Sequence, residues 1–101
     1  MAQMSTVETG DVFEAQIFAL LESEIGNDRF LVRRENCKIF RKKGYFSKDR
    51  GSDIVFDVAI EVHRPGANDY SFVFLIECKR YSHAVPVDDI EEFYAKVQQV
   101  A

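Results

Sequence analysis

The stretch Phe72-Val73-Phe74-Leu75-Ile76-Glu77-Cys78-Lys79-Arg80 decides the fold of this 101-residue chain. Its apolar run is unbroken and rich in β-branched and aromatic residues, which predicts a strand buried on both faces. Side chains alternate along a strand, so Glu77 and Lys79 fall on the same side. Opposite charges at the end of a core strand are costly to bury without partners. The pattern therefore indicates a catalytic site in which a metal ion is the partner of the two charged side chains.

A second strand is predicted just before it, because apolar residues alternate with other residues from Ile54 to Val62. The turn-forming residues 65–69 separate the two strands, which predicts an antiparallel hairpin. With the turn centred near Ala67, Asp57 faces Glu77, and their Cβ atoms lie roughly 5 Å apart. Two carboxylates at that distance repel each other strongly unless a cation lies between them.

An amphipathic helix is expected at each end of the chain, over Val7–Ile25 and Val87–Val100. Glu14 lies at the edge of the first helix's apolar stripe and is either a solvated boundary residue or an acid that reaches a metal site. Residues 30–34 fit a short helix or a strand. The remaining expectations are a strand over Cys37–Arg41, a turn at Lys42-Lys43-Gly44, a loop over Tyr45–Ser52 and a loop over Tyr81–Pro86.

The charges of the chain are segregated. The formal net charge is −4, and no Lys or Arg precedes Arg29, whereas eight basic residues fall between Arg33 and Arg50 against Glu35 and Asp49, which gives 8 − 2 = +6. A local basic field can hold phosphates even on an acidic protein; a solvated basic loop is the plainer interpretation. The residues predicted to bind nucleic acid are Arg41, Lys42, Lys43, Lys48 and Arg50.

Composition indicates one globular domain over residues 1–101, at 47% hydrophobic and 30% charged. No apolar run approaches the roughly 20 residues of a membrane helix, and the first ten residues do not resemble a signal peptide. Cys37 and Cys78 have no CxxC spacing, which favours free thiols in a cytoplasmic protein. His63 and His83 are expected at the surface.

The order of helix, strand, Asp-bearing strand, strand ending in Glu77-Cys78-Lys79-Arg80-Tyr81, and helix resembles the PD-(D/E)xK nuclease superfamily. The likeness is closest to the Mrr-like and type IV restriction branch, and it covers roughly residues 13–100. It implies an α/β fold of the restriction-endonuclease type, with an αβββα core and a mixed sheet flanked by helices. An ExK tripeptide alone is weak evidence for this family. An ExK tripeptide at the end of an apolar strand, preceded by an Asp-bearing strand of the same hairpin, is far more specific evidence.

The resemblance also implies roles for individual residues. Asp57 and Glu77 would hold Mg²⁺ or Mn²⁺, and the backbone carbonyl of Cys78 would be a further oxygen ligand. Lys79 would orient or deprotonate the attacking water, and Glu14 would support the metal site through water. The implied activity is metal-dependent endonucleolytic cleavage of DNA.

The chain departs from the family pattern in three respects. Phe56 replaces the proline before the Asp, and Asp53, after Gly51-Ser52, rivals Asp57 as the metal ligand. Asp57 is preferred because the hairpin sets it across from Glu77. The chain also stops after the second helix, where the family core normally continues, so a fragment or a minimal form is expected, and an unpaired sheet edge would favour a homodimer.

Other interpretations stay open at this point. Glu77 and Lys79 fit a structural ion pair, although buried pairs rarely repay their desolvation. A catalytically inactive nuclease-like domain that binds nucleic acid or a protein partner is the alternative function. A purely structural α/β domain is the third, and the basic segment argues against it.

Overall fold

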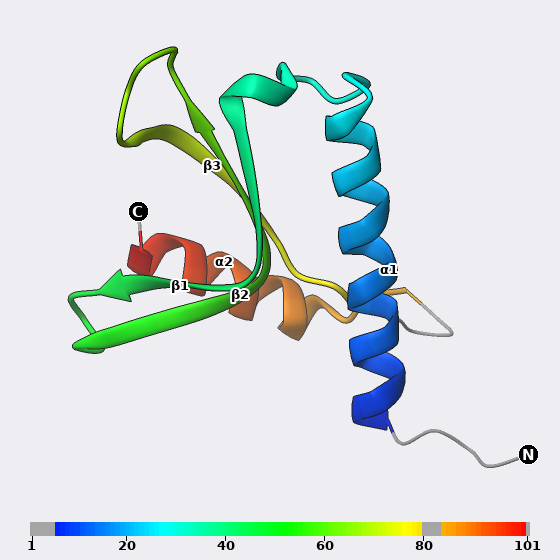
Figure 1. Ribbon diagram of the computed structural model, residues 1–101. Helices are drawn as coiled ribbons and strands as arrows, with labels where there is room; N and C mark the ends of the chain where they lie inside the picture. The colour runs from blue at the N-terminus through cyan, green and yellow to red at the C-terminus, as the bar shows by residue number, and fades with distance from the viewer. Residues whose placement is uncertain (1–5, 80–83, 101) are drawn as a thin grey trace, which may run out of the picture.

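Two helices flank a three-stranded sheet in the computed structural model, which describes residues 6–79 and 84–100, with side chains from residue 10 onward (Figure 1). The elements, in chain order, are α1 (Thr6–Gly26), a 3₁₀ turn η1 (Arg34–Asn36), β1 (Cys37–Ser47), β2 (Ser52–His63), β3 (Tyr70–Ile76) and α2 (Val87–Val100). This α-β-β-β-α order confirms the expected fold class. The loop predicted over Tyr81–Pro86 falls partly outside the described residues.

The sheet has the order β1-β2-β3, and both pairs of strands are antiparallel. The sheet was expected to be mixed, but short turns join its strands, and a parallel pair would need a crossover connection. Between β2 and β3, Val58 pairs with Ile76 and Ile60 with Phe74. The predicted register is therefore confirmed. The ladder ends at the pair Val58–Ile76, and Asp57 and Glu77 are the next residues beyond that pair.

β1 is much longer than predicted. Residues 42–44 do not turn the chain, and residues 45–47 are not loop, because β1 continues to Ser47 and stays paired with β2 as far as Ser52. The Tyr45 ring packs on Phe56 with centroids 6.2 Å apart, which anchors this end of the ribbon. The turn lies at residues 48–51, where Gly51 adopts φ 68°, a conformation that glycine takes without steric cost.

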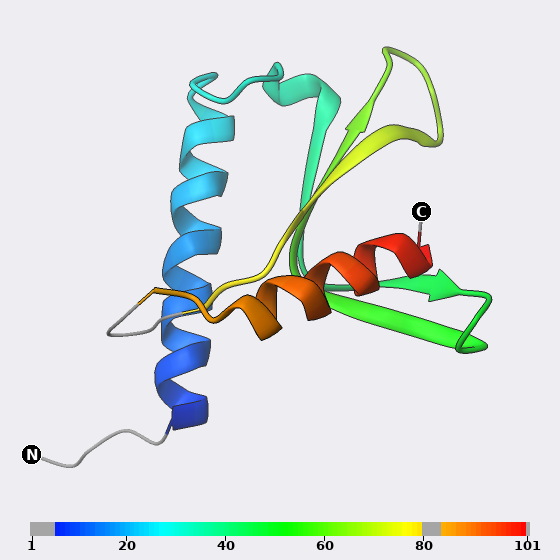
Figure 2. The same cartoon turned by 180° about the vertical axis from the view of Figure 1, so that it is seen from behind.

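The ladder between β1 and β2 has one gap. Its pairs run from Arg41–Val58 to Lys43–Phe56, with no pair between Lys42 and Asp57. Lys42 has φ 52° there, in the left-handed region that is costly for a residue with a Cβ atom. Local disruption of a ladder bends the strands, and Figures 1 and 2 show β1 and β2 as a sharply bent ribbon.

The best-buried strand is β2 rather than β3. Residues 58–62 of β2 are all buried, because β2 is the central strand and has a partner on each side. No residue of β3 reaches that burial, and Phe72 is 48% exposed. The prediction that the Phe72–Ile76 run is buried on both faces was therefore wrong, since β3 is an edge strand.

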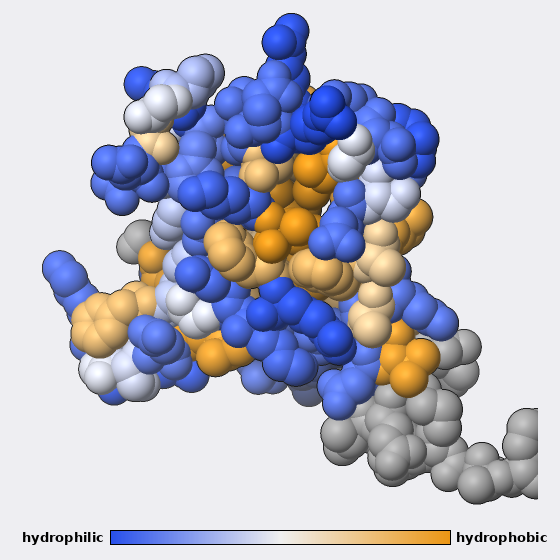
Figure 3. All heavy atoms as spheres, in the orientation of Figure 1, coloured by the Kyte–Doolittle hydropathy of each residue, from blue (hydrophilic) through white to orange (hydrophobic). Residues whose placement is uncertain are grey.

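The helices cover different parts of the ribbon. Figures 1 and 2 show α1 alongside one limb and α2 along the other. Phe93 of α2 packs edge-on against the fully buried Phe56, with ring centroids 6.1 Å apart. Apolar residues gather in the middle of the face in Figure 3, between polar margins. This arrangement brings α2 close to the end of β3, where the predicted site lies.

Candidate active site

The Asp57 and Glu77 carboxyl groups lie together at the end of the β2–β3 ladder. The backbone N–H of Cys78 donates to Asp57 Oδ2 at 2.8 Å, and Lys96 Nζ donates to Glu77 Oε1 at 2.8 Å. Burial raises the pKa of Glu77, the hydrogen bond from Lys96 opposes that effect, and the negative charge of the neighbouring Asp57 raises the pKa further. The pair has the mutual repulsion that the register predicted.

Glu14 is part of the same charged cluster. Its side chain is 6% exposed, Arg41 Nε donates to its Oε1 at 3.1 Å and Lys42 Nζ to its Oε2 at 3.0 Å. The hydrogen bond with Glu14 raises the pKa of Lys42 despite desolvation, and the charge of Asp57 adds to the increase. The interpretation of Glu14 as a solvated boundary residue is therefore wrong, because α1 carries it onto β1 beside the gap in the ladder.

Cys78 lies at the centre of these acids. Burial, followed by the charges of Asp57, Glu14 and Glu77, raises the pKa of its thiol to about 11. Cys37 and Cys78 are both free cysteines, as expected. All three predicted acids therefore lie close enough to act on one thiol at the end of β3.

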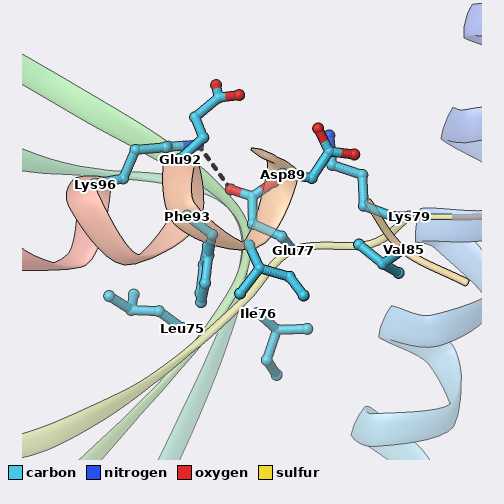
Figure 4. A pocket seen from close by; sticks show the side chains of 10 residues that line it. Leu75, Ile76, Glu77, Lys79, Val85, Asp89, Glu92, Phe93 and Lys96 are labelled. Carbon is cyan, nitrogen blue, oxygen red and sulfur yellow. Dashed lines mark hydrogen bonds and ion pairs between the residues drawn. The ribbon is translucent and has the colours of Figure 1, made fainter. Parts of the chain in front are cut away.

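Lys79 is exposed and follows β3 by three residues. It lines a cleft of about 400 Å³ between the end of β3 and α2, as do Glu77 and Lys96. Figure 4 shows Glu77 between the two lysines, with Lys96 on one side and Lys79 on the side of Asp89. Glu77 and Lys79 thus line one cleft, but both lie beyond Ile76, where β3 ends. The strand was predicted to continue to Lys79, so the alternation of a strand does not account for their shared position.

The five residues predicted to bind nucleic acid divide into two groups. Arg41 and Lys42 contact Glu14. The others lie towards the β1–β2 turn: Lys43 Nζ lies 4.6 Å from the centroid of the Phe40 ring, Arg50 Nε donates to Gln99 Oε1 at 2.8 Å, and Lys48 is exposed.

Asp53, the rival metal ligand, is exposed and pairs with Phe46 of β1. It packs over Gly44, where an added Cβ would lie 3.0 Å from Asp53 Oδ2. It falls outside the part of β2 that pairs with β3, which begins at Val58. Its position is that of a residue near the β1–β2 turn, away from the strand end that carries Glu77.

The donor set suits a magnesium ion. Within residues 6–79 and 84–100, no three His, Cys, Asp or Glu side chains are grouped so that they could hold a metal. Magnesium nevertheless keeps several waters and is usually bound by one or two carboxylates together with substrate phosphates. Asp57 and Glu77 supply two neighbouring carboxyl groups whose mutual repulsion raises the pKa of Glu77, and a bound divalent cation would relieve that repulsion. The residues therefore fit Mg²⁺ or Mn²⁺.

Sequence reasoning missed Lys96, whose ammonium contacts Glu77. The available signal was that Lys96 is the only basic residue of α2 and lies one turn after Glu92. It also misplaced His63, which was expected at the surface: the side chain is 10% exposed and lies with Nε2 3.7 Å from Glu61 Oε1. His83 falls outside the described residues.

The α-β-β-β-α core, with one carboxylate within β2 and another directly after β3, defines a domain of the restriction-endonuclease-like class. The family model Mrr_cat, described as a restriction endonuclease, matches residues 9–100, and the chain belongs to this family. Neither the curated proteins nor the solved structures give a significant match to the chain. None of the described helices is long and apolar enough to cross a membrane.

Proposed function

We propose that the domain is a divalent-metal-dependent endonuclease that cleaves DNA, with Asp57, Glu77 and Lys79 at its catalytic centre. Membership of the restriction endonuclease family supports nuclease activity in general. The observation that carries the proposal is the pair of adjacent carboxyl groups at the end of the β2–β3 ladder. Carboxylate oxygens are the ligands that Mg²⁺ and Mn²⁺ prefer.

Each residue has a role in this proposal. Asp57, Glu77 and the carbonyl oxygen of Cys78 would hold the ion, which when bound polarises the scissile phosphate and activates a water. The N–H of Cys78 fixes the orientation of the Asp57 carboxylate. Lys79 orients the attacking water in the cleft and offsets negative charge as the phosphate becomes more crowded. Glu14 holds Arg41 and Lys42 beside the site.

The cleft gives Lys79 room for this role. Lys79 is exposed and lines the same cleft as Glu77, so its ammonium is accessible to a bound phosphate. Lys43, Lys48 and Arg50 lie on β1 and the turn that follows it, and they would contact the phosphate backbone of the duplex at a distance from the cut.

One observation favours the alternative, a catalytically inactive domain that binds nucleic acid or a protein partner. Glu14 is neutralised by Arg41 and Lys42, and Glu77 is bonded to Lys96. The charges of the cluster are therefore nearly balanced by the protein's own cations, as a domain without a metal would need.

The test is cleavage of supercoiled plasmid DNA by the purified protein with Mg²⁺ or Mn²⁺, compared with EDTA. We expect cleavage that requires the metal, that falls by a factor of about 10² or more in Lys79→Ala, and that persists in Lys38→Ala, which removes an exposed lysine far along β1. Cleavage that survives Lys79→Ala would reject the assigned site. Retention of DNA in EDTA, with no cleavage when metal is added, would favour the binding domain.

A further inference from the structure

The ammonium group of Lys96 occupies the place beside Glu77 where a metal ion would bind in the proposed site. Its Nζ lies 2.8 Å from Glu77 Oε1 and 5.1 Å from the centroid of the Phe56 ring. The side chains of Lys96 and Glu77 are only 20% and 15% exposed. Charge-assisted hydrogen bonds of this kind are about twice as strong as neutral ones, so this contact is a firm one.

The charges of the cluster leave little room for a divalent ion in addition. Three cations, Arg41, Lys42 and Lys96, contact or lie opposite the acids Glu14, Asp57 and Glu77, and Lys42 also pairs with Asp11, with Nζ 3.7 Å from Oδ1. Arg41 and Lys42 are held by Glu14, on the side of α1. Lys96 is the one cation among the described residues that is bonded to Glu77, and it is therefore the group that an incoming ion meets.

α2 offers Lys96 another acceptor. Glu92 precedes Lys96 by four residues, the spacing and order that favour a Glu–Lys pair on one helix face. Both side chains line the cleft beside Glu77, and Figure 4 shows the Glu92 side chain next to that of Lys96. Rotation about the side-chain bonds of Lys96 would move its ammonium from Glu77 to Glu92 while keeping it in the cleft.

We propose that Lys96 is the resident counter-ion of Glu77, and that a divalent cation binds by displacing its ammonium to Glu92. Lys96 and Glu92 are then positioning residues that set the metal affinity of the site from α2. This inference rests on the proposed metal site. It explains how a cluster whose charges are balanced without metal can still take up an ion.

The experiment is calorimetric titration of the whole chain with Mn²⁺ at low salt, without DNA. Lys96→Met removes the competitor, and we expect its Mn²⁺ dissociation constant to fall about tenfold, equivalent to about 1.4 kcal/mol. Glu92→Gln removes the alternative acceptor and should weaken binding about threefold. Lys38→Met is the control, because it removes the same charge from an exposed position on β1, and it should change the constant less than about twofold.

A second readout is the melting temperature. Lys96→Met should melt below the wild-type protein in EDTA, since Glu77 loses its partner, and it should gain more from added Mn²⁺. If Lys96→Met does not fold, the exposed Glu92→Gln variant still decides the question, and unchanged Mn²⁺ affinity in that variant would then overturn the inference.

The outcomes separate the two proposals. If the wild-type protein binds Mn²⁺ and Lys96→Met binds it no more tightly, or if Lys38→Met tightens binding equally, the displacement of Lys96 is refuted while the metal site stands. If neither the wild-type protein nor Lys96→Met binds Mn²⁺, the metal-dependent function fails and this inference fails with it. Binding by Lys96→Met alone would show that Lys96 blocks the site without being displaced, and would refute the displacement.

Discussion

Glu14 shows how much one side chain contributes to this fold. It is a buried carboxylate on α1, and both of its oxygens accept hydrogen bonds from cations on β1. Few other contacts join α1 to the sheet within the described residues, although Arg41 also donates to the carbonyl oxygen of Asp11 at 3.1 Å. The ion pairs of Glu14 therefore join the first helix to the strand that borders the proposed site.

We expect Glu14→Gln to lower the free energy of unfolding by about 1–3 kcal/mol, because it weakens two charge-assisted hydrogen bonds at a buried position. Urea denaturation followed by circular dichroism measures the change. The control is Glu24→Gln on the same helix. It alters the exposed ion pair of Glu24 with Arg29 and should leave the denaturation curve nearly unchanged. Equal effects of the two substitutions would contradict the structural importance assigned to Glu14.

The Cys78 thiol should be unreactive at neutral pH. Because its pKa is raised to about 11, roughly one molecule in a thousand carries the thiolate at pH 8, and the thiolate is the reactive form. In a Cys37→Ser background, the rate of labelling by a disulfide reagent should rise about tenfold per pH unit from pH 7 to pH 10. A rate that levels off near pH 8.5 would show a thiol with an ordinary pKa and would contradict the clustering of acids around it.

Across the bend, β1 and β2 are joined by side chains as well as by their ladder. Tyr45 Oη donates to Glu61 Oε2 at 2.6 Å, and the Glu61 side chain is 9% exposed. Burial and the hydrogen bond with Glu61 raise the pKa of Tyr45, so the phenol remains a donor over the whole range in which the protein would be handled. This bond connects the end of β1 near the turn with the opposite limb of β2.

We expect Tyr45→Phe to destabilise the protein by about 1–3 kcal/mol, because a buried carboxylate oxygen loses its donor. The matched control is Tyr94→Phe on α2, where the tyrosine is 65% exposed and loss of the hydroxyl should matter little. Thermal unfolding of the three proteins measures the difference. If Tyr45→Phe melts at the same temperature as Tyr94→Phe, the hydroxyl does not contribute to the bend.

The sequence predicted the elements that follow from local patterns. Apolar periodicity placed both helices within one or two residues, and the length of the β2–β3 turn was enough to set Asp57 against Glu77. The extension of β1 was missed because Gly44 and its basic neighbours have the composition of a turn. Their strand conformation depends on pairing with β2, which no local pattern reveals.

The contacts of the site were less predictable than its strands. The Lys96–Glu77 pair joins two residues that are 19 positions apart in the sequence, and no periodicity links such positions. The burial of Glu14 and the exposure of β3 depend on which element covers which face. These features follow from tertiary packing, whereas the position of Asp57 follows from strand register alone.

At the scale of the whole molecule, charge is unevenly distributed. The net charge is −4, yet β1 and its following turn carry the basic residues predicted to hold DNA. Because Arg41 and Lys42 are already paired with Glu14, we expect only Lys43, Lys48 and Arg50 of these five residues to meet phosphates.

That difference can be measured by the salt dependence of DNA binding in EDTA, followed by fluorescence anisotropy of a labelled duplex, with the Lys79→Ala protein so that the cleft lysine does not contribute. Three phosphate contacts predict a slope of about −2.7 for log K against log[salt], from about −0.9 per contact. Lys48→Ala should flatten the slope by about 0.9. A slope near −4.5, which five contacts would give, would show that Arg41 and Lys42 leave Glu14 when DNA binds.

The hydrogen bond from the peptide nitrogen of residue 78 to Asp57 has a consequence for tolerance to exchange. The donor belongs to the main chain, so every amino acid except proline supplies it. We therefore expect position 78 to accept substitution, although it follows the proposed metal ligand Glu77 directly. A saturation library at that codon should retain ion binding for small residues such as serine and alanine, and should lose it for the one residue that has no amide proton.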